Sequence, residues 1–126
     1  MDTYDALIVW SPMGRHRNIQ EIPVLVDQYL KSGKLVLYAP CERDKTPWDV
    51  PLGNVEIILA GEEDIQEACQ QREQISKRLK KLGKHRVEIV GSWAFFCLKN
   101  LGEYLLEEGF EPEINLEYST RNAFSN

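Results

Sequence analysis

Short, nearly continuous apolar runs alternate along the chain with longer stretches of helical spacing. Because strands covered on both faces lack polar alternation, these runs predict the buried strands of a parallel sheet. They are rich in β-branched residues, are bounded by Gly or Pro, and lie at residues 4–10, 35–39, 55–60 and 87–90. A last run at residues 114–118 alternates between apolar and polar positions and predicts an edge strand.

Helices are expected between these strands. The first runs from residue 21 or 23 to residue 32, since Pro23 is tolerated only in a first helical turn and Gly33 is a natural stop. The last helix is expected at residues 93–108. It brings apolar side chains to neighbouring turns, namely Cys97, Leu101, Tyr104 and Leu105.

The longest helix is expected at residues 63–82, where apolar positions recur on one stripe that should face the core. Its acidic first turn and basic last turn complement the helix dipole, so we interpret these charge runs as solvated helix ends. The stripe consists of Ile65, Ala68, Cys69, Ile75, Leu79 and Leu82.

This order of elements is typical of the α/β class and predicts a three-layer Rossmann-like fold, with a mostly parallel sheet of about five strands flanked by helices. The 126 residues suffice for a single domain, residues 1–126, with a polar tail at about residues 119–126. A net charge of -5 argues against a nucleic-acid partner. Since the chain has neither an apolar run of membrane-spanning length nor a secretory start, we expect a cytoplasmic protein with no membrane partner.

Cysteine and histidine are few. Cys41, Cys69 and Cys97 are spaced in a way that matches no zinc or redox motif, and His16 and His85 lie apart from them. We therefore expect free thiols, no bound metal and no cofactor.

Ligands of an open parallel sheet bind beyond the carboxyl ends of its strands, so the site residues are expected there. The segment at residues 11–18 carries Arg15 and Arg17, a positive cluster that fits either an anion site or a solvated turn. Ser92 is most simply the N-cap of the last helix. The candidate binding residues at this edge are Ser11, Arg15, Arg17, Cys41, Gly61, Glu62, Ser92 and Trp93.

Cys97 is the candidate catalytic residue. A cysteine shortly after a strand lies near helix amide groups that lower a thiol pKa, which would make it a nucleophile. Nucleophilic catalysis also needs a base, and the sequence gives neither histidine a place beside Cys97. The alternative is a packed structural thiol.

Residues 87–112 (VEIVGSWAFFCLKNLGEYLLEEGFEP) resemble a segment of the isochorismatase-like cysteine hydrolases, in which a strand ends in Gly and a helix carries the nucleophilic Cys six residues later. Gly91 and Cys97 have that spacing. Residues 19–40 are similar to the family's Ile-Pro helix and second strand, and residues 6–13 to its first strand. The resemblance implies the family's α/β fold and a nucleophilic role for Cys97.

The resemblance also implies a catalytic Asp and Lys that this chain lacks. Ser11 stands at the position aligned with the Asp, and Gly61 and Glu62 stand where the Lys belongs. Trp93 occupies the family's cis-peptide segment, where small or β-branched residues are usual. Since such residues act as a unit, we expect a catalytically degenerate domain.

The predicted function is therefore that of a module that binds a small anion or a protein partner. We expect it to form a homo-oligomer that buries aromatic side chains between subunits, with Trp48, Trp93 or Phe110 as candidates. Two alternatives remain open. One is an active cysteine hydrolase acting on a small amide or ether, with His16, Glu62 or Glu63 as a rewired base. The other is a nucleotide- or phosphate-binding regulator that uses the loop at residues 11–18.

Overall fold

The chain folds into alternating strands and helices, and the computed structural model describes residues 4–10, 21–39, 55–57, 67–92 and 97–120. In this part of the chain the elements follow one another as β1 (Ala6–Trp10), α2 (Ile22–Lys31), β2 (Leu35–Ala39), β3 (Val55–Ile57), α3 (Glu67–Lys81), β4 (Arg86–Ser92), α4 (Lys99–Glu107) and β5 (Glu111–Thr120).

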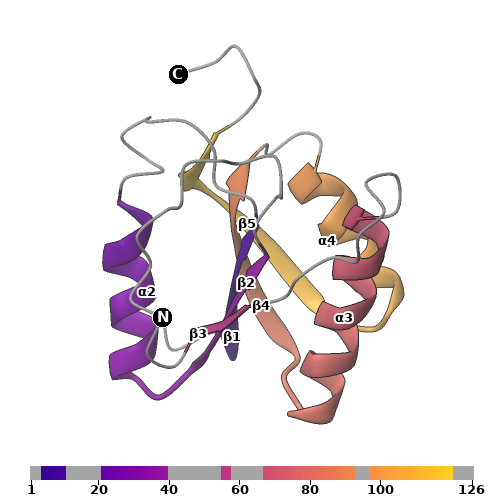
Figure 1. Ribbon diagram of the computed structural model, residues 1–126, viewed down its shortest axis with the longest axis horizontal. Coiled ribbons are helices and arrows are strands. Elements are labelled where there is room, and N and C mark those ends of the chain that lie inside the picture. Colours follow the sequence, from indigo (N-terminus) through magenta and orange to yellow (C-terminus); the bar gives the residue numbers. More distant parts are fainter. Residues whose placement is uncertain (1–3, 11–20, 40–54, 58–66, 93–96, 121–126) are drawn as a thin grey trace.

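The described strands form one open sheet in the order β3-β2-β1-β4-β5, and their pairings are parallel (Figure 1). β1 lies inside the sheet and pairs along its whole length with β2 on one side and β4 on the other. The chain adds β2 and β3 on one side of β1, then returns through α3 to add β4 and β5 on the other. This reversal creates a topological switch point between the carboxyl ends of β1 and β4.

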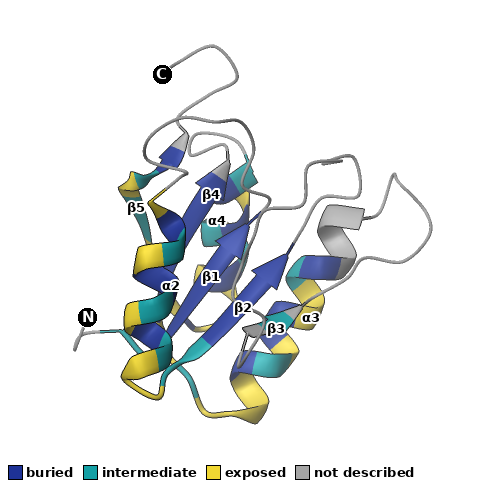
Figure 2. Cartoon of the chain, turned by 60° about the vertical axis from the view of Figure 1, so that its left-hand side comes forward, coloured by how far each residue is buried: buried dark blue, intermediate teal, exposed yellow. Residues whose placement is uncertain are grey.

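Helices cover both faces of this sheet (Figures 1 and 2). Because successive side chains of a strand point to opposite faces, Leu7 and Val9 of β1 face α2, whereas Ile8 and Trp10 face α3 and α4. The α2 face is closed by Ile22, Leu25, Val26 and Tyr29, and the other face by Ile75, Leu79, Leu101 and Leu105. The predicted α/β class, with a parallel sheet flanked by helices, is confirmed.

The helices end close to where the sequence predicted. α2 carries Pro23 in its first turn and is followed by the turn at Gly33. In α3, Ile75 and Leu79 are fully buried, as expected. The expectation for Leu82 is wrong: this residue lies beyond the last turn of α3 and is 39% exposed. The side chains of the other stripe positions, Ile65, Ala68 and Cys69, lie outside the described residues.

Two expectations around α4 are also wrong. Ser92 is not the N-cap of this helix, because β4 continues through Ser92 to pair it with Thr120, and the N-cap position of α4 is held by Leu98. Phe110 is not free to line a subunit interface. It follows α4 and is buried in the core of the single chain, on the face that α3 and α4 cover.

β5 is an edge strand, as its alternation predicted, but it departs from regular pairing. Two steps along β4, from Ile89 to Gly91, correspond to five steps along β5, from Ile114 to Ser119. Asn115 closes this bulge, since its carbonyl accepts the Ser119 hydroxyl group at 2.7 Å. Ser119 therefore belongs to the sheet and not to the predicted polar tail.

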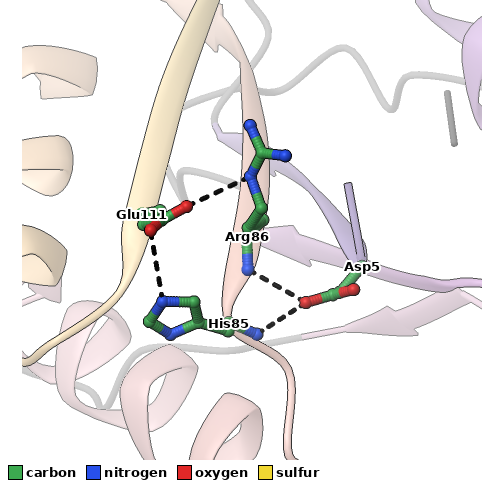
Figure 3. A network of polar contacts seen from close by, with 4 residues as sticks. All are labelled: Asp5, His85, Arg86 and Glu111. Atoms are coloured by element: carbon green, nitrogen blue, oxygen red, sulfur yellow. Dashed lines mark hydrogen bonds and ion pairs between the residues drawn. The ribbon is translucent and has the colours of Figure 1, made fainter. Parts of the chain in front are cut away.

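Asp5, directly before β1, fixes the start of β4 (Figure 3). Its Oδ2 atom accepts hydrogen bonds from the backbone N–H groups of His85 at 2.9 Å and Arg86 at 3.0 Å. Glu111 at the start of β5 contacts the His85 ring at 3.5 Å and the Arg86 guanidinium group at 3.1 Å. The backbone N–H groups of Arg86 and His85 lower the pKa of the Asp5 carboxyl group below its ordinary value. The charged form of Asp5 is therefore the one that stabilises this edge.

Replacing Asp5 by Asn keeps an acceptor but removes the charge, so we expect the free energy of unfolding at pH 7 to fall by about 1 kcal/mol. Because the pKa of Asp5 is depressed in the folded state, this contribution is complete above the unfolded-state pKa of about 3.9 and is lost as the pH falls through the folded-state value. Urea denaturation of the wild type and Asp5→Asn at a series of pH values measures the difference, which should vanish at the acidic end.

Asp27→Asn is the matched control, because it removes an exposed carboxylate that pairs with Lys31 at 2.9 Å. This control should change the free energy of unfolding by less than about 0.5 kcal/mol. A stability difference between wild type and Asp5→Asn that stays constant from neutral to acidic pH would contradict the role of the Asp5 charge.

Candidate functional site

The sequence predicts a site at the carboxyl edge of the sheet. The structure describes the ends of β1 and β4 at this edge, which we call the floor of the site. β1 ends at Trp10, which pairs with Gly91 of β4. β1 and β4 are neighbours in the sheet at the point where the strand order reverses, which is the arrangement at which open α/β sheets bind ligands. The sequence predicted a site at the carboxyl edge of the sheet, and the spatial order of the strands in the structure singles out β1 and β4 within this edge.

Gly91 of β4 lies against the Trp10 backbone of β1. Its φ of 131° is a backbone conformation that side chains rarely adopt. A Cβ atom at this position would lie 1.9 Å from the Trp10 carbonyl oxygen and 2.8 Å from the Trp10 carbonyl carbon. Both contacts are with backbone, so no side-chain movement could relieve them. The floor of the site thus requires glycine at position 91.

Cys97 lies between β4 and α4, in a wider helical turn that it shares with Leu98. It is a free cysteine, half-buried, and packs against the apolar cluster on the face that α3 and α4 cover. Leu98 and Leu101 beside it are fully buried. A thiol in such surroundings behaves as a small apolar side chain. This environment favours the interpretation of Cys97 as a packed thiol.

His85 lies at the opposite end of β4 from Cys97. It directly precedes this strand, and its ring faces Glu111. The seven residues of β4 separate the two ends by about 20 Å. A general base must lie within hydrogen-bond reach of the group that it deprotonates, so His85 does not serve Cys97.

Most of the binding residues predicted from the sequence fall in the segments that follow β1, β2, β3 and β4. The backbone of Ser92 is part of β4, where it pairs with Thr120. The remaining predicted residues lie outside the described part of the chain: Ser11, Arg15, Arg17, Cys41, Gly61, Glu62 and Trp93, together with His16, Glu63 and Trp48.

A buried carboxylate in β4 was not among the residues predicted from the sequence. Glu88 is 6% exposed and lies on the face of the sheet that α2 covers. Its Oε1 atom accepts the Tyr29 hydroxyl group of α2 at 2.7 Å, and its Oε2 atom accepts the Asn115 amide group of β5 at 2.6 Å. The charged residue inside the run VEIV was the signal that could have revealed it.

The Glu88 network joins three elements of the fold. Burial and the neighbouring Glu88 carboxylate raise the pKa of the Tyr29 hydroxyl group far above its ordinary value. Burial, together with a hydrogen bond to Glu113, raises the pKa of Tyr4 to about 12. Both hydroxyl groups stay protonated at physiological pH, so Tyr29 remains a donor to Glu88. The network anchors the β5 bulge to α2 and β4, and we assign it a structural role.

Among the described residues, no three His, Cys, Asp or Glu side chains lie close enough to hold a metal ion. No helix among these residues is both long and apolar enough to cross a membrane.

Comparison with known proteins gives no family assignment. No protein-family model matches the chain, and no curated protein is significantly similar to it. The structure defines the class as an α/β domain with an open parallel sheet. The resemblance to isochorismatase-like hydrolases remains a prediction from the residues.

Replacing Gly91 by Ala should prevent folding or lower the free energy of unfolding by more than about 4 kcal/mol, because the new Cβ atom would overlap the Trp10 backbone. Chemical denaturation followed by far-UV circular dichroism measures the effect. Gly102→Ala in α4 is the matched control, since its Cβ atom would meet the Ile114 side chain at an ordinary 4.0 Å. The control should be neutral or stabilise by up to about 1 kcal/mol. A free energy of unfolding of Gly91→Ala equal to that of the wild type would contradict the close approach of Gly91 to the Trp10 backbone.

Proposed function

We propose that the chain is a Rossmann-like, isochorismatase-like domain without catalytic activity that binds a small anion or a protein partner at the carboxyl edge of its sheet. The observation that carries the proposal is the switch point between β1 and β4, where Gly91 lies directly beside the Trp10 backbone. Ligands of open α/β sheets bind outside such a point because the connecting segments diverge there.

Charge supports an anion as the ligand. Residues 11–18 follow β1 directly and carry Arg15 and Arg17. Guanidinium groups bind anions through paired, charge-assisted hydrogen bonds. Since β1 ends at the switch point, these arginines belong to a segment that begins beside the proposed site.

The surroundings of Cys97 support a role other than catalysis. A nucleophilic cysteine needs a base or a cationic environment to form its thiolate. Cys97 packs against apolar side chains, and His85 lies at the far end of β4. Assembly into a homo-oligomer remains part of the proposal, now through Trp48 or Trp93, because Phe110 is buried in the core.

Inorganic phosphate tests the binding half of the proposal. Titration into isotope-labelled protein should shift the backbone amide signals of Trp10 and Gly91 in NMR spectra. Arg15→Ala/Arg17→Ala should weaken this binding by about tenfold or more, because two charge-assisted contacts are lost. Lys31→Ala/Lys77→Ala removes two cations elsewhere in the chain and is the matched control, which should bind phosphate as the wild type does.

Two outcomes would contradict the proposal. One is phosphate binding that is unaffected by the loss of both arginines. The other is rapid alkylation of Cys97 by iodoacetamide in a Cys41→Ser/Cys69→Ser background. We expect a rate no higher than that of an ordinary thiol with a pKa of about 8.5. A faster reaction would indicate an activated thiolate and an active hydrolase.

A further inference from the structure

A hollow opens at the amino edge of the sheet, at the opposite end of the strands from the site proposed above. Its volume is about 320 Å³, at the lower end of the range in which proteins bind small molecules. The turn after α2 and the turn after α3 form it, and Figure 2 shows both turns at the lower end of the molecule. The lining residues are Leu30, Gly33, Lys34, Leu35, Leu82 and Lys84.

Both turns have the same backbone geometry. After α2, the Lys34 N–H group donates to the Tyr29 carbonyl at 3.0 Å, and after α3 the Lys84 N–H group donates to the Leu79 carbonyl at 2.9 Å. The glycines that precede these lysines have φ values of 70° and 67°. These features define a Schellman motif, in which a left-handed glycine ends the helix. Each turn therefore sets a lysine at the same position relative to its helix.

The turn after α4 has the same motif with a different residue at this position. There the Phe110 N–H group donates to the Leu105 carbonyl at 3.0 Å, and the Phe110 side chain is buried in the core. An apolar residue at this position commonly packs against the last turn of the helix. After α2 and α3, this position is occupied by Lys34 and Lys84 instead of an apolar residue. The leucines near them line the hollow, and Leu82 is 39% exposed.

The helix dipoles alone do not account for these two lysines. α2 already has Lys31 in its last turn, and α3 has Arg78, Lys80 and Lys81. Lys34 and Lys84 follow the helices and are half-buried, and both line the hollow. Their position beside apolar side chains gives the hollow both cationic and apolar lining residues.

Neighbouring contacts hold both lysines in place. Asp5 accepts hydrogen bonds from the two backbone N–H groups that follow Lys84 (Figure 3), and the Lys84 charge also helps to lower the pKa of Asp5. The Lys34 ammonium group donates to the Tyr4 carbonyl at 2.6 Å. The cationic wall of the hollow is thereby fixed to the start of β1.

We propose that this hollow binds a small organic anion with an apolar body, such as a medium-chain carboxylate. The carboxylate pairs with the ammonium groups of Lys84 and Lys34, and the apolar body covers the leucines of the lining. An ion pair at a partly exposed site contributes little by itself. Burial of the alkyl chain against the leucines supplies the remaining affinity and the selectivity for an amphipathic anion.

Octanoate is the probe, titrated into isotope-labelled protein while the amide signals of Gly33, Leu82 and Lys84 are followed by NMR. We expect saturable shifts at these amides with a dissociation constant on the order of 1 mM. Acetate lacks the apolar body and octanol lacks the charge. Each should bind at least about fivefold more weakly than octanoate.

Lys84→Gln should weaken octanoate binding about fivefold and reduce its dependence on salt, because one of the two cations that line the hollow is removed. Lys81→Gln is the matched control, since this lysine lies in the last turn of α3 and not in the lining. Leu82→Ser should weaken octanoate binding and leave the weak response to acetate unchanged. Thermal unfolding of each variant checks that the fold is retained.

Equal octanoate binding by wild type and Lys84→Gln would overturn the proposal, as would equal binding of acetate, octanol and octanoate. Shifts confined to Trp10 and Gly91 would assign the carboxylate to the opposite edge of the sheet and would overturn it too. Arg15→Ala/Arg17→Ala should leave octanoate binding unchanged. Failure of this site is therefore distinguishable from failure of the phosphate site.

Discussion

The close pairing of β1 with β4 is the contact on which the rest of the structure depends. β1 has a neighbour on each side and a helix layer on each face, so its five residues are buried in every direction. Gly91 lets β4 continue past the end of β1 because it has no side chain to strike the Trp10 carbonyl. The same contact places the change of strand order, and hence the proposed ligand site, at the carboxyl ends of these two strands.

The two edges of the sheet differ in chemistry. At the carboxyl edge, the floor consists of the Trp10 and Gly91 backbone, and the charged residues belong to the connecting segments. At the amino edge, Asp5 and Glu111 hold the starts of three strands together, while lysines stand where helix ends normally close with apolar residues. The carboxyl edge fits a site whose specificity comes from the connecting segments. The amino edge fits a shallow site formed by the turns after α2 and α3.

The local pattern of residues was sufficient to predict β2 and α2. The apolar run at β2 and the Pro and Gly that bound α2 fixed these elements closely, because burial and backbone preference point to the same answer there. The sequence assigned the candidate site to the carboxyl edge of the sheet, whereas the switch point within this edge depends on the spatial order of the strands, which the structure provides. The chemistry of the site was less predictable, because most of the residues that supply it belong to connections with no periodic pattern.

The expectations that failed depended on contacts between segments distant in sequence. Leu82 continues the periodicity of α3, but the helix ends before it. Glu88 looked like one more residue of a buried strand, and its partners Tyr29 and Asn115 come from elements far along the chain. Phe110 is one of the interface candidates from the sequence, but the turn after α4 places it in the core of the single chain. Periodicity within one segment carries no information on these contacts.

Native-state hydrogen exchange tests the central role of the β1–β4 pair most directly. The amides of Ile8, Val9 and Ile89 should be the slowest to exchange, with an opening free energy equal to that of global unfolding. The amides of the β5 bulge should exchange earlier through local opening. Exchange of the β1 and β4 amides ahead of those in α2, at denaturant concentrations well below the unfolding transition, would contradict the account.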